Sequence, residues 1–135
     1  MAVSKVLRMK TTDTAALYFR FLQMARSALT LPCGSDLSPL ERQLLEEVFV
    51  CEYEHRPLTV KQAASLKHLA SPSTLHKKLT RLRALQWLAV QHQGGDHRTK
   101  YLVLTPIAKQ YFHSLDEAMH KAMAMHTRAV SRAPR

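Results

Sequence analysis

The sequence has little of what disulfide-rich or membrane-spanning proteins contain. Its 135 residues include only two cysteines and three glycines. Two isolated cysteines cannot build a disulfide framework, and without a Cys-x-x-Cys pair a zinc or thiol-redox site is not expected. The longest stretch without a charged residue, 84–95, is too short to cross about 30 Å of hydrocarbon. The N-terminus also lacks the apolar segment of a secretory signal. We therefore expect one globular, cytoplasmic domain.

Acidic residues are scarce in the middle of the chain. The whole sequence has 20 Lys and Arg against 10 Asp and Glu. Residues 1–55 hold six basic and seven acidic residues, whereas residues 56–110 hold ten basic and one acidic. The middle segment therefore carries a net charge of +9, a positive field suited to a polyanion. Nucleic acid is the first candidate, and an anionic membrane surface is the second.

Motifs of catalysis and metal binding are also missing. The sequence has no glycine-rich phosphate loop, no Gly-x-Ser-x-Gly and no His-Glu-x-x-His. Its eight histidines are not spaced as metal ligands. An ordinary loop thiol is favoured over a redox sensor for Cys33, since only Arg26 lies near it in sequence. We expect no enzymatic activity, no cofactor and no bound metal.

Capping signals predict four helices. Residues 38–41 and 59–62 are capping boxes, in which the first and fourth side chains satisfy each other's backbone N–H groups. Ser71 and Thr105 each precede a proline, the residue best suited to the first helical position. The helices predicted from these signals cover residues 38–55, 59–66, 71–86 and 106–127.

Apolar periodicity predicts a further helix and a hairpin. After N-cap residues at 11–13, apolar residues recur at helical spacing as far as Leu29. Beyond Leu85 the period changes to two, and Gly94-Gly95 allows a tight reversal. A β-hairpin is therefore expected over residues 88–104. The resulting order is that of a mainly α, winged helix-turn-helix fold with a small hairpin wing.

The first and last helices have more apolar surface than one chain can bury. The last helix, if it ends near Thr127, is about 33 Å long, and a core built from residues 38–105 cannot cover that length. Two adjacent apolar rows also run along the first helix. Pairing these helices with those of a second copy is the simplest way to bury this surface, so the sequence predicts a homodimer.

The stretch from Leu58 to Phe112, with its flanking helices, resembles the MarR family of bacterial transcriptional regulators. The resemblance is carried by these motifs in this order: Leu58-Thr59, Ser71-Pro72-Ser73-Thr74-Leu75, the spacing of Leu79 and Leu82, Asp96-His97-Arg98 and Leu104-Thr105-Pro106. It implies a sequence-specific regulator of duplex DNA that acts as a homodimer. A small-molecule effector, in a pocket lined by Tyr18, Phe21 and Met24, is what the family would allow.

The resemblance also implies how the chain is organised. Residues 1–135 would be a single winged-helix domain, with residues 38–105 as the DNA-binding core and residues 1–35 and 106–135 as dimerisation helices. Helix 71–86 would enter a major groove of duplex DNA and the wing 88–104 a minor groove. The rival interpretation is a winged-helix module that binds RNA or a protein partner and regulates no promoter.

The candidate contact residues lie on helix 71–86 and in the wing. If its leucines face the core, a step of about 100° per residue places a polar face without acidic residues on the other side. Ordinary solvated faces mix charges, so DNA binding is the favoured interpretation. In the wing, an arginine suits the minor groove and an aspartate could orient it, although an exposed ion pair alone would explain both. The candidates are Ser73, Thr74, His76, Lys77, Thr80, Arg81, Asp96 and Arg98.

Three places depart from the family's pattern. The turn over residues 67–70 lacks its usual glycine, and we expect His68 to take the left-handed conformation there. Gln86 stands where the family usually has a glycine at the end of the recognition helix, and Ala108 replaces another glycine in the last helix. Local backbone geometry is expected to differ at these positions.

Overall fold

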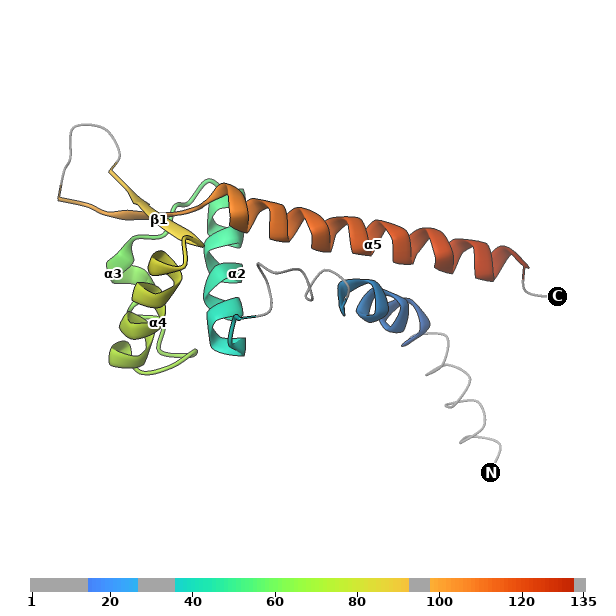
Figure 1. The fold of residues 1–135 in the computed structure, drawn as a ribbon, viewed down its shortest axis with the longest axis horizontal. Helices are drawn as coiled ribbons and strands as arrows, with labels where there is room; N and C mark the ends of the chain where they lie inside the picture. The colour runs from blue at the N-terminus through green and yellow to red at the C-terminus, as the bar shows by residue number, and fades with distance from the viewer. Residues whose placement is uncertain (1–14, 27–35, 93–97, 133–135) are drawn as a thin grey trace, which may run out of the picture. The chain divides into compact units, whose positions relative to one another are not determined.

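The computed structural model describes residues 15–26, 36–92 and 98–132. It confirms the predicted mainly α, winged helix-turn-helix fold (Figure 1). A helix over residues 15–26 comes first. It is followed by α2 (Pro39–Tyr53), α3 (Val60–Ala63), α4 (Pro72–Ala84), β1 (Leu88–Gln91), β2 (Tyr101–Leu104) and α5 (Pro106–Arg132).

The chain divides into two compact units. The central unit is Asp36–Gln110, and the terminal unit consists of the described parts of residues 1–35 and 111–135. The central unit contains the helix-turn-helix and the hairpin, and the positively charged segment 56–110 of the sequence lies within its bounds.

Both predicted capping boxes are formed. The Glu41 N–H donates to Ser38 Oγ at 3.2 Å, and the Ser38 N–H donates to Glu41 Oε1 at 2.9 Å. Thr59 and Gln62 make the same reciprocal pair, both bonds at 3.0 Å. Ser71 occupies the N-cap of α4 but makes no side-chain cap hydrogen bond. Proline at the first position therefore defines the start of α4 without help from the serine side chain.

Left-handed residues end α4 and α2. Gln86 has φ 65°, its N–H donates to the Arg83 carbonyl at 3.1 Å, and the Trp87 N–H donates to the Leu82 carbonyl at 2.9 Å. These two bonds form a Schellman motif, which requires positive φ at Gln86 and explains why a glycine is suited to this place. His55, with φ 58°, ends α2 in the same way.

The prediction for the turn between α3 and α4 was wrong in two respects. Among the described non-glycine residues, positive φ occurs at His55 and Gln86 and not at His68. Helix α3 also ends at Ala63, not near residue 66. Short-range bonds such as Leu69 N–H to the Leu66 carbonyl at 3.0 Å reverse the chain in successive turns, so no left-handed residue is needed. The last helix was underestimated too, because α5 continues to Arg132.

The core of the central unit is built mainly from leucines. Helix α2 contacts α4 and β2, and α4 contacts β1. The predicted leucine stripe of α4 is confirmed, since all three of its members are buried. The buried apolar side chains of α2, α4 and the strands are Leu44, Leu45, Val48, Leu75, Leu79, Leu82, Leu88, Leu102 and Leu104.

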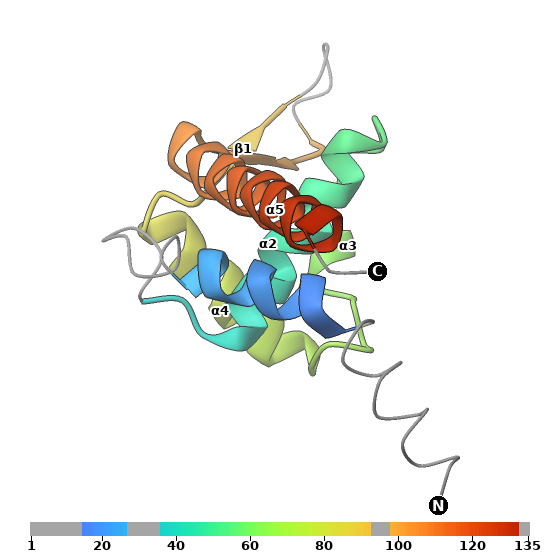
Figure 2. The same ribbon diagram turned by 90° about the vertical axis from the view of Figure 1, so that its right-hand side faces the viewer.

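The hairpin is tied to the segment before α3. Strands β1 and β2 pair antiparallel, with Leu88 opposite Leu104 and Gln91 opposite Tyr101, and they lie side by side in both views (Figures 1 and 2). Thr59 bridges Tyr101. The Val60 N–H donates to the Lys100 carbonyl at 3.0 Å, and the Leu102 N–H donates to the Leu58 carbonyl at 2.8 Å. These backbone bonds fix the base of the wing against the start of α3.

The terminal unit combines buried small residues with exposed large ones. Ala25, Ala118 and Ala122 are buried, as is Tyr111. Five large apolar side chains of the same unit are each more than half exposed: Tyr18, Phe19, Met119, Met123 and Val130. Within the described ranges, no helix combines the length and the apolar character needed to cross a membrane.

Candidate nucleic-acid interface

The polar face of α4 is directed to solvent. Four of the predicted candidates, Ser73, His76, Lys77 and Thr80, are exposed. Helix α4 contains no acidic residue. The Thr80 hydroxyl donates to the His76 carbonyl at 2.9 Å, which fixes its rotamer. The exposed face therefore offers one ammonium, one imidazole and hydroxyl groups as donors.

Thr74 lies differently from the other candidates on α4. Its side chain is half-buried, and its Oγ1 accepts a hydrogen bond of 2.9 Å from the Ser71 hydroxyl. The Ser71 and Ser73 hydroxyls are 3.4 Å apart. Three hydroxyl groups thus gather at the N-terminus of α4, where they are suited to hydrogen bonding with a phosphate or a base edge.

Arg81 has an intramolecular partner that the sequence analysis missed. Its Nη1 donates to both carboxylate oxygens of Glu41 at 2.6 Å, and both Nη atoms donate to the Asp36 carbonyl at 3.2 Å. The Glu41 side chain is 0% exposed and that of Arg81 44% exposed. The guanidinium therefore anchors α4 to the first turn of α2.

The carboxyl of Glu41 is held in its charged form. Burial on its own raises the pKa of this group. The hydrogen bonds from the Ser38 backbone and side chain and from Arg81, together with the Arg81 charge, outweigh burial and leave the pKa of Glu41 below its ordinary value.

A basic groove separates α4 from the base of the wing. This cavity of about 460 Å³ is bounded by the start of α3, by α4 and by the segment before β2. None of the described residues that line this cavity is acidic. The residues that line the basic groove are Thr59, Val60, Lys61, Ala64, His76, Arg98, Thr99 and Lys100.

The groove joins candidates that are distant in the sequence. His76 and Arg98 were predicted as DNA contacts, whereas Lys61 and Lys100 were not. The net charge of the segment does not show which of its lysines line the same groove. The second predicted wing residue, Asp96, lies outside the described residues, as do Gly94, Gly95 and Cys33.

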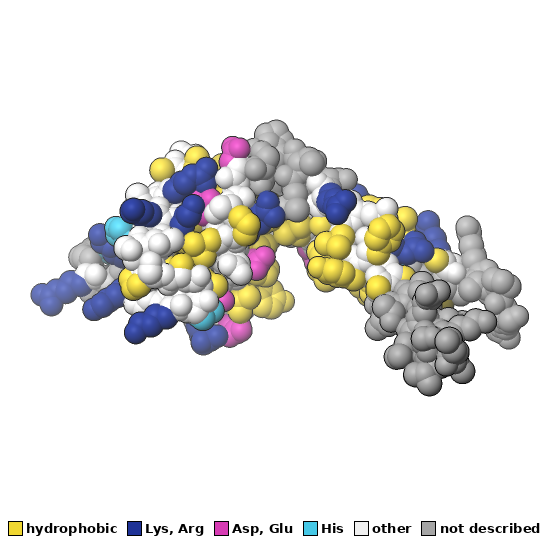
Figure 3. All heavy atoms as spheres, turned by 90° about the horizontal axis from the view of Figure 1, so that it is seen from below, with side chains coloured by type: hydrophobic (Ala, Val, Ile, Leu, Met, Phe, Trp, Pro, Cys, Tyr) yellow, Lys and Arg dark blue, Asp and Glu magenta, His cyan; other side chains and the backbone are white. Residues whose placement is uncertain are grey.

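Positive charge gathers at one end of the central unit. In Figure 3, Lys and Arg side chains occupy the left-hand end, which carries α3, α4 and the hairpin, whereas Asp and Glu side chains lie further to the right on this unit. The acidic residues of the unit belong mainly to α2, at Glu41, Glu46, Glu47 and Glu52. The charge asymmetry of the sequence is therefore also an asymmetry of the surface.

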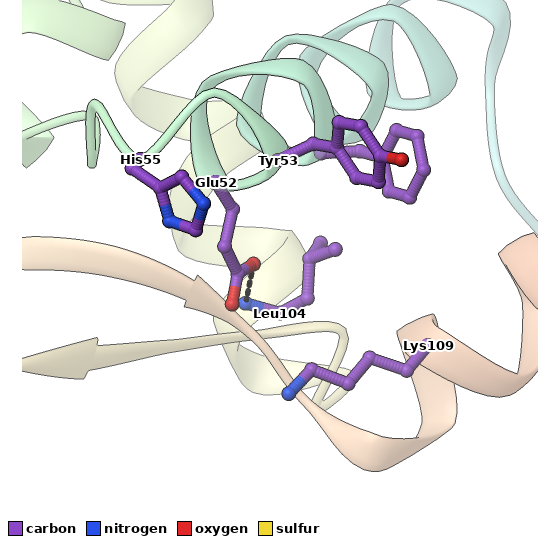
Figure 4. A pocket seen from close by; sticks show the side chains of 6 residues that line it. Glu52, Tyr53, His55, Leu104 and Lys109 are labelled. Carbon is purple, nitrogen blue, oxygen red and sulfur yellow. Dashed lines mark hydrogen bonds between the residues drawn. The ribbon is translucent and has the colours of Figure 1, made fainter.

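A second cavity lies where α2, β2 and the start of α5 meet (Figure 4). It measures about 530 Å³ and is lined by Phe49, Glu52, Tyr53, His55, Leu104 and Lys109. The rings of Phe49 and Tyr53 are stacked at 6.1 Å. The Leu104 N–H donates to Glu52 Oε2 at 3.3 Å. These residues differ from Tyr18, Phe21 and Met24, which were expected to line an effector pocket.

The described residues contain no candidate metal site and one described cysteine. No group of three His, Cys, Asp or Glu side chains within residues 15–26, 36–92 and 98–132 could hold a metal ion. Cys51 is a free, half-buried thiol.

Comparison with known proteins gives structural matches and no sequence match. No family model matches the chain, and no curated protein sequence matches it. The fold is similar to that of the transcriptional regulator Tm0710 from Thermotoga maritima, at 18% identity and a TM-score of 0.63, over 96% of this chain and 80% of that one. S. aureus MepR bound to ethidium bromide is 18% identical with a TM-score of 0.63, over 98% of this chain and 83% of the other.

A third match is the YusO protein from Bacillus subtilis, at 19% identity and a TM-score of 0.57, over 98% of this chain and 86% of that one. These structures have the winged helix-turn-helix fold of MarR-family regulators. The predicted resemblance is thus confirmed at the level of the fold.

Proposed function

We propose that this protein is a homodimeric, sequence-specific regulator of transcription that binds duplex DNA. Helix α4 enters a major groove, and the wing contacts the adjacent minor groove. The observation that carries this proposal is an exposed face of α4 without acidic residues, beside a groove lined by Lys61, Arg98 and Lys100. A major groove about 12 Å wide accepts a helix, and the phosphates on either side require positive charge.

The polar residues of α4 have two proposed roles, which are to contact DNA and to anchor the helix to the rest of the unit. Lys77 can donate to guanine O6 and N7, while Ser73 and Thr80 can serve bases or phosphates. Arg81 is left out of the proposed contacts because its guanidinium is bonded to Glu41 and Asp36. Its role is to hold the helix that carries the other residues.

The wing supplies the second contact. Arg98 is exposed and suits the negative potential of a minor groove. Asp96, two residues earlier, is proposed to orient it, as the family resemblance implies.

The terminal unit supports the dimer. Its large exposed side chains, which include Tyr18, Met119 and Met123, are apolar surface of the kind that protein interfaces cover. A second copy of the same helices covers this surface in a closed, symmetric assembly. Two recognition helices then face two half-sites of a palindromic operator.

The test begins with selection of bound fragments from random duplex DNA, followed by anisotropy titrations of the full chain. We expect a palindromic site and a slope of log K against log salt on the order of −5 or steeper. Lys77→Ala should weaken the selected site by about 1 to 3 kcal/mol and a scrambled duplex less. Arg98→Ala should weaken both duplexes, with a preference that follows groove width.

Lys121→Ala is the matched control, because it removes the same charge from an exposed position on α5 that lines neither the basic groove nor the cavity of Figure 4. A flat salt response would contradict the proposal. Tighter binding of single-stranded or structured RNA than of any duplex would favour the rival RNA-binding module instead.

The cavity of Figure 4 is the proposed place for a small-molecule effector. Its stacked rings, Phe49 and Tyr53, offer a flat apolar wall, and Glu52 and Lys109 offer one charge of each sign. MepR has been solved with ethidium bound, so ethidium in the absence of DNA is a suitable fluorescent probe. Binding that Tyr53→Ala does not weaken would argue against this place.

A further inference from the structure

Strand β1 is an edge strand with a groove along its free side. Within the described residues it pairs with β2 alone, and β2 is bonded on its other side to the segment before α3. Helix α4 packs against β1 (Figure 1) and forms the opposite wall of a groove of about 510 Å³. This edge groove is lined by Thr80, Arg83, Ala84, Leu88, Ala89 and Val90. Consecutive strand residues line it, whereas one face of a strand presents alternate residues, so the groove runs along the edge.

The backbone groups of Leu88 and Val90 are directed toward this groove. The N–H groups of Leu102 and Leu104 on β2 donate away from β1. Their partners in the register are Val90 and Leu88, and opposite residues of an antiparallel ladder exchange both of their bonds or neither. Among the described segments outside the hairpin, no backbone group bonds to Leu88 or Val90. One wall of the groove therefore offers alternating N–H donors and C=O acceptors.

Strand β1 lacks the features that usually protect an exposed edge. Natural edge strands carry charged residues, proline or a bulge. The sequence of β1, Leu-Ala-Val-Gln, contains no charge and no proline, and it pairs with β2 residue for residue. A phosphate group offers acceptor oxygens only, so it cannot satisfy the free carbonyls. Another extended strand offers both donors and acceptors and can add to the sheet.

The α4 wall of the groove determines the charge that such a strand should carry. Arg83 is exposed at the groove, and the small side chains of Thr80 and Ala84 beside it leave room for a strand. Residues 72–91, which form both walls and their connection, include four basic residues and no acidic one. A carboxylate is the natural partner of a guanidinium. A second copy of β1 on this edge would instead bring two positively charged walls together, which opposes association.

We propose that the edge groove is a docking site for an extended acidic segment of a partner protein. The segment adds a strand to the free edge of β1 and places a carboxylate against Arg83. This interaction is separate from the proposed DNA contacts, because it uses the backbone of β1 and an arginine that is not among them. Of the residues that line the groove, Thr80 is the one that is also proposed to contact DNA.

The charge of the segment is tested by anisotropy titration of the full chain with a short fluorescein-labelled peptide of alternating valine and glutamate. Peptides with lysine in place of glutamate, or with every backbone amide N-methylated, should bind at least about tenfold more weakly. Arg83→Glu should weaken binding of the acidic peptide by about tenfold and make the lysine peptide the tighter ligand. Arg128→Glu, at an exposed position of α5 outside the groove, is the matched control and should bind as the parent does.

The addition of a strand is tested at the edge itself. Val90→Pro removes an outward N–H, a change that an edge strand tolerates, so the thermal melt should stay close to that of the parent. The variant should bind the acidic peptide about fivefold more weakly, which corresponds to the loss of one hydrogen bond. In the parent, bound peptide should slow amide hydrogen exchange at Leu88 and Val90. Exchange should not change at Ala89 and Gln91, whose N–H groups already face β2.

Binding of the acidic peptide that neither Arg83→Glu nor Val90→Pro weakens would overturn the inference. Equal binding of the lysine peptide would also overturn it, as would no binding of the acidic peptide at millimolar concentration. Association of chains beyond the dimer that Val90→Pro abolishes would assign the edge to a second copy and overturn the inference as well. None of these results bears on duplex binding, which is judged by the Lys77→Ala and Arg98→Ala titrations.

Discussion

Replacing Arg81 by alanine removes the group that joins α4 to the start of α2. The change deletes the hydrogen bonds to Glu41 and to the Asp36 carbonyl. It also leaves the fully buried Glu41 carboxylate with the Ser38 backbone N–H and side chain as its remaining described hydrogen-bond partners. Breaking a fully buried ion pair costs about 3 to 5 kcal/mol.

The expected loss of stability is smaller for Arg81→Ala. The Arg81 side chain is 44% exposed, so water can enter the space that it leaves and solvate part of the carboxylate. We therefore expect Arg81→Ala to lower the free energy of unfolding by about 2 kcal/mol, near the lower limit for a charged hydrogen-bonded pair. Arg83→Ala, which removes the same charge from an exposed position on the same helix, should change it by less than about 0.5 kcal/mol.

The pH dependence of this stabilisation has a fixed sign. The pKa of Glu41 is lower in the folded chain than its ordinary value. The pair therefore stabilises the fold fully above the ordinary pKa of glutamate, and this contribution is lost as the pH falls through the folded-state pKa. In Arg81→Ala the pKa of Glu41 should rise, and in Glu41→Gln the titrating group is gone, so both variants should lose less stability in acid than the parent.

Urea denaturation followed by circular dichroism, at neutral pH and at several acid pH values, measures both effects. The double variant Arg81→Ala with Glu41→Gln completes a mutant cycle and isolates the coupling between the two side chains. The reasoning is refuted if Arg81→Ala is as stable as Arg83→Ala at neutral pH, or if the acid dependence is unchanged when either partner is replaced.

Two further predictions concern the end of α4 and the assembly. Gln86→Gly should stabilise the fold by about 0.5 to 1 kcal/mol, because glycine removes the steric cost of a side chain at positive φ, although it also raises the entropy of the unfolded chain. Thermal melts should therefore show a melting temperature that is higher by a few degrees. The control Gln91→Gly, in β1, should lower the melting temperature. In light scattering the parent should have twice the 15.4 kDa mass of one chain. The double variant Met119→Glu with Met123→Glu should shift the measured mass toward that of the monomer. The control Lys121→Glu should leave the mass unchanged. A parent that stays monomeric at micromolar concentration would contradict the dimer.

Several elements could be predicted from the sequence because their causes are local. A capping box joins residues three positions apart, so Ser38 with Glu41 and Thr59 with Gln62 specify their own hydrogen bonds. The leucine spacing of α4 likewise determines which side of the helix is buried. The strong positive charge of residues 56–110 was sufficient to suggest a polyanion as partner.

Other features depend on contacts between segments that the sequence keeps apart. Helical spacing placed Arg81 on the polar face of α4, but it could not identify Glu41, 40 residues away, as its partner. The same holds for the basic groove, which Lys61 and Lys100 both line because backbone bonds dock the base of the wing onto the start of α3. Composition and periodicity determine which side chains are charged and which faces are buried, because both follow from near neighbours. Tertiary packing decides which charges meet, because the distance between them is set by the core that packs beneath them.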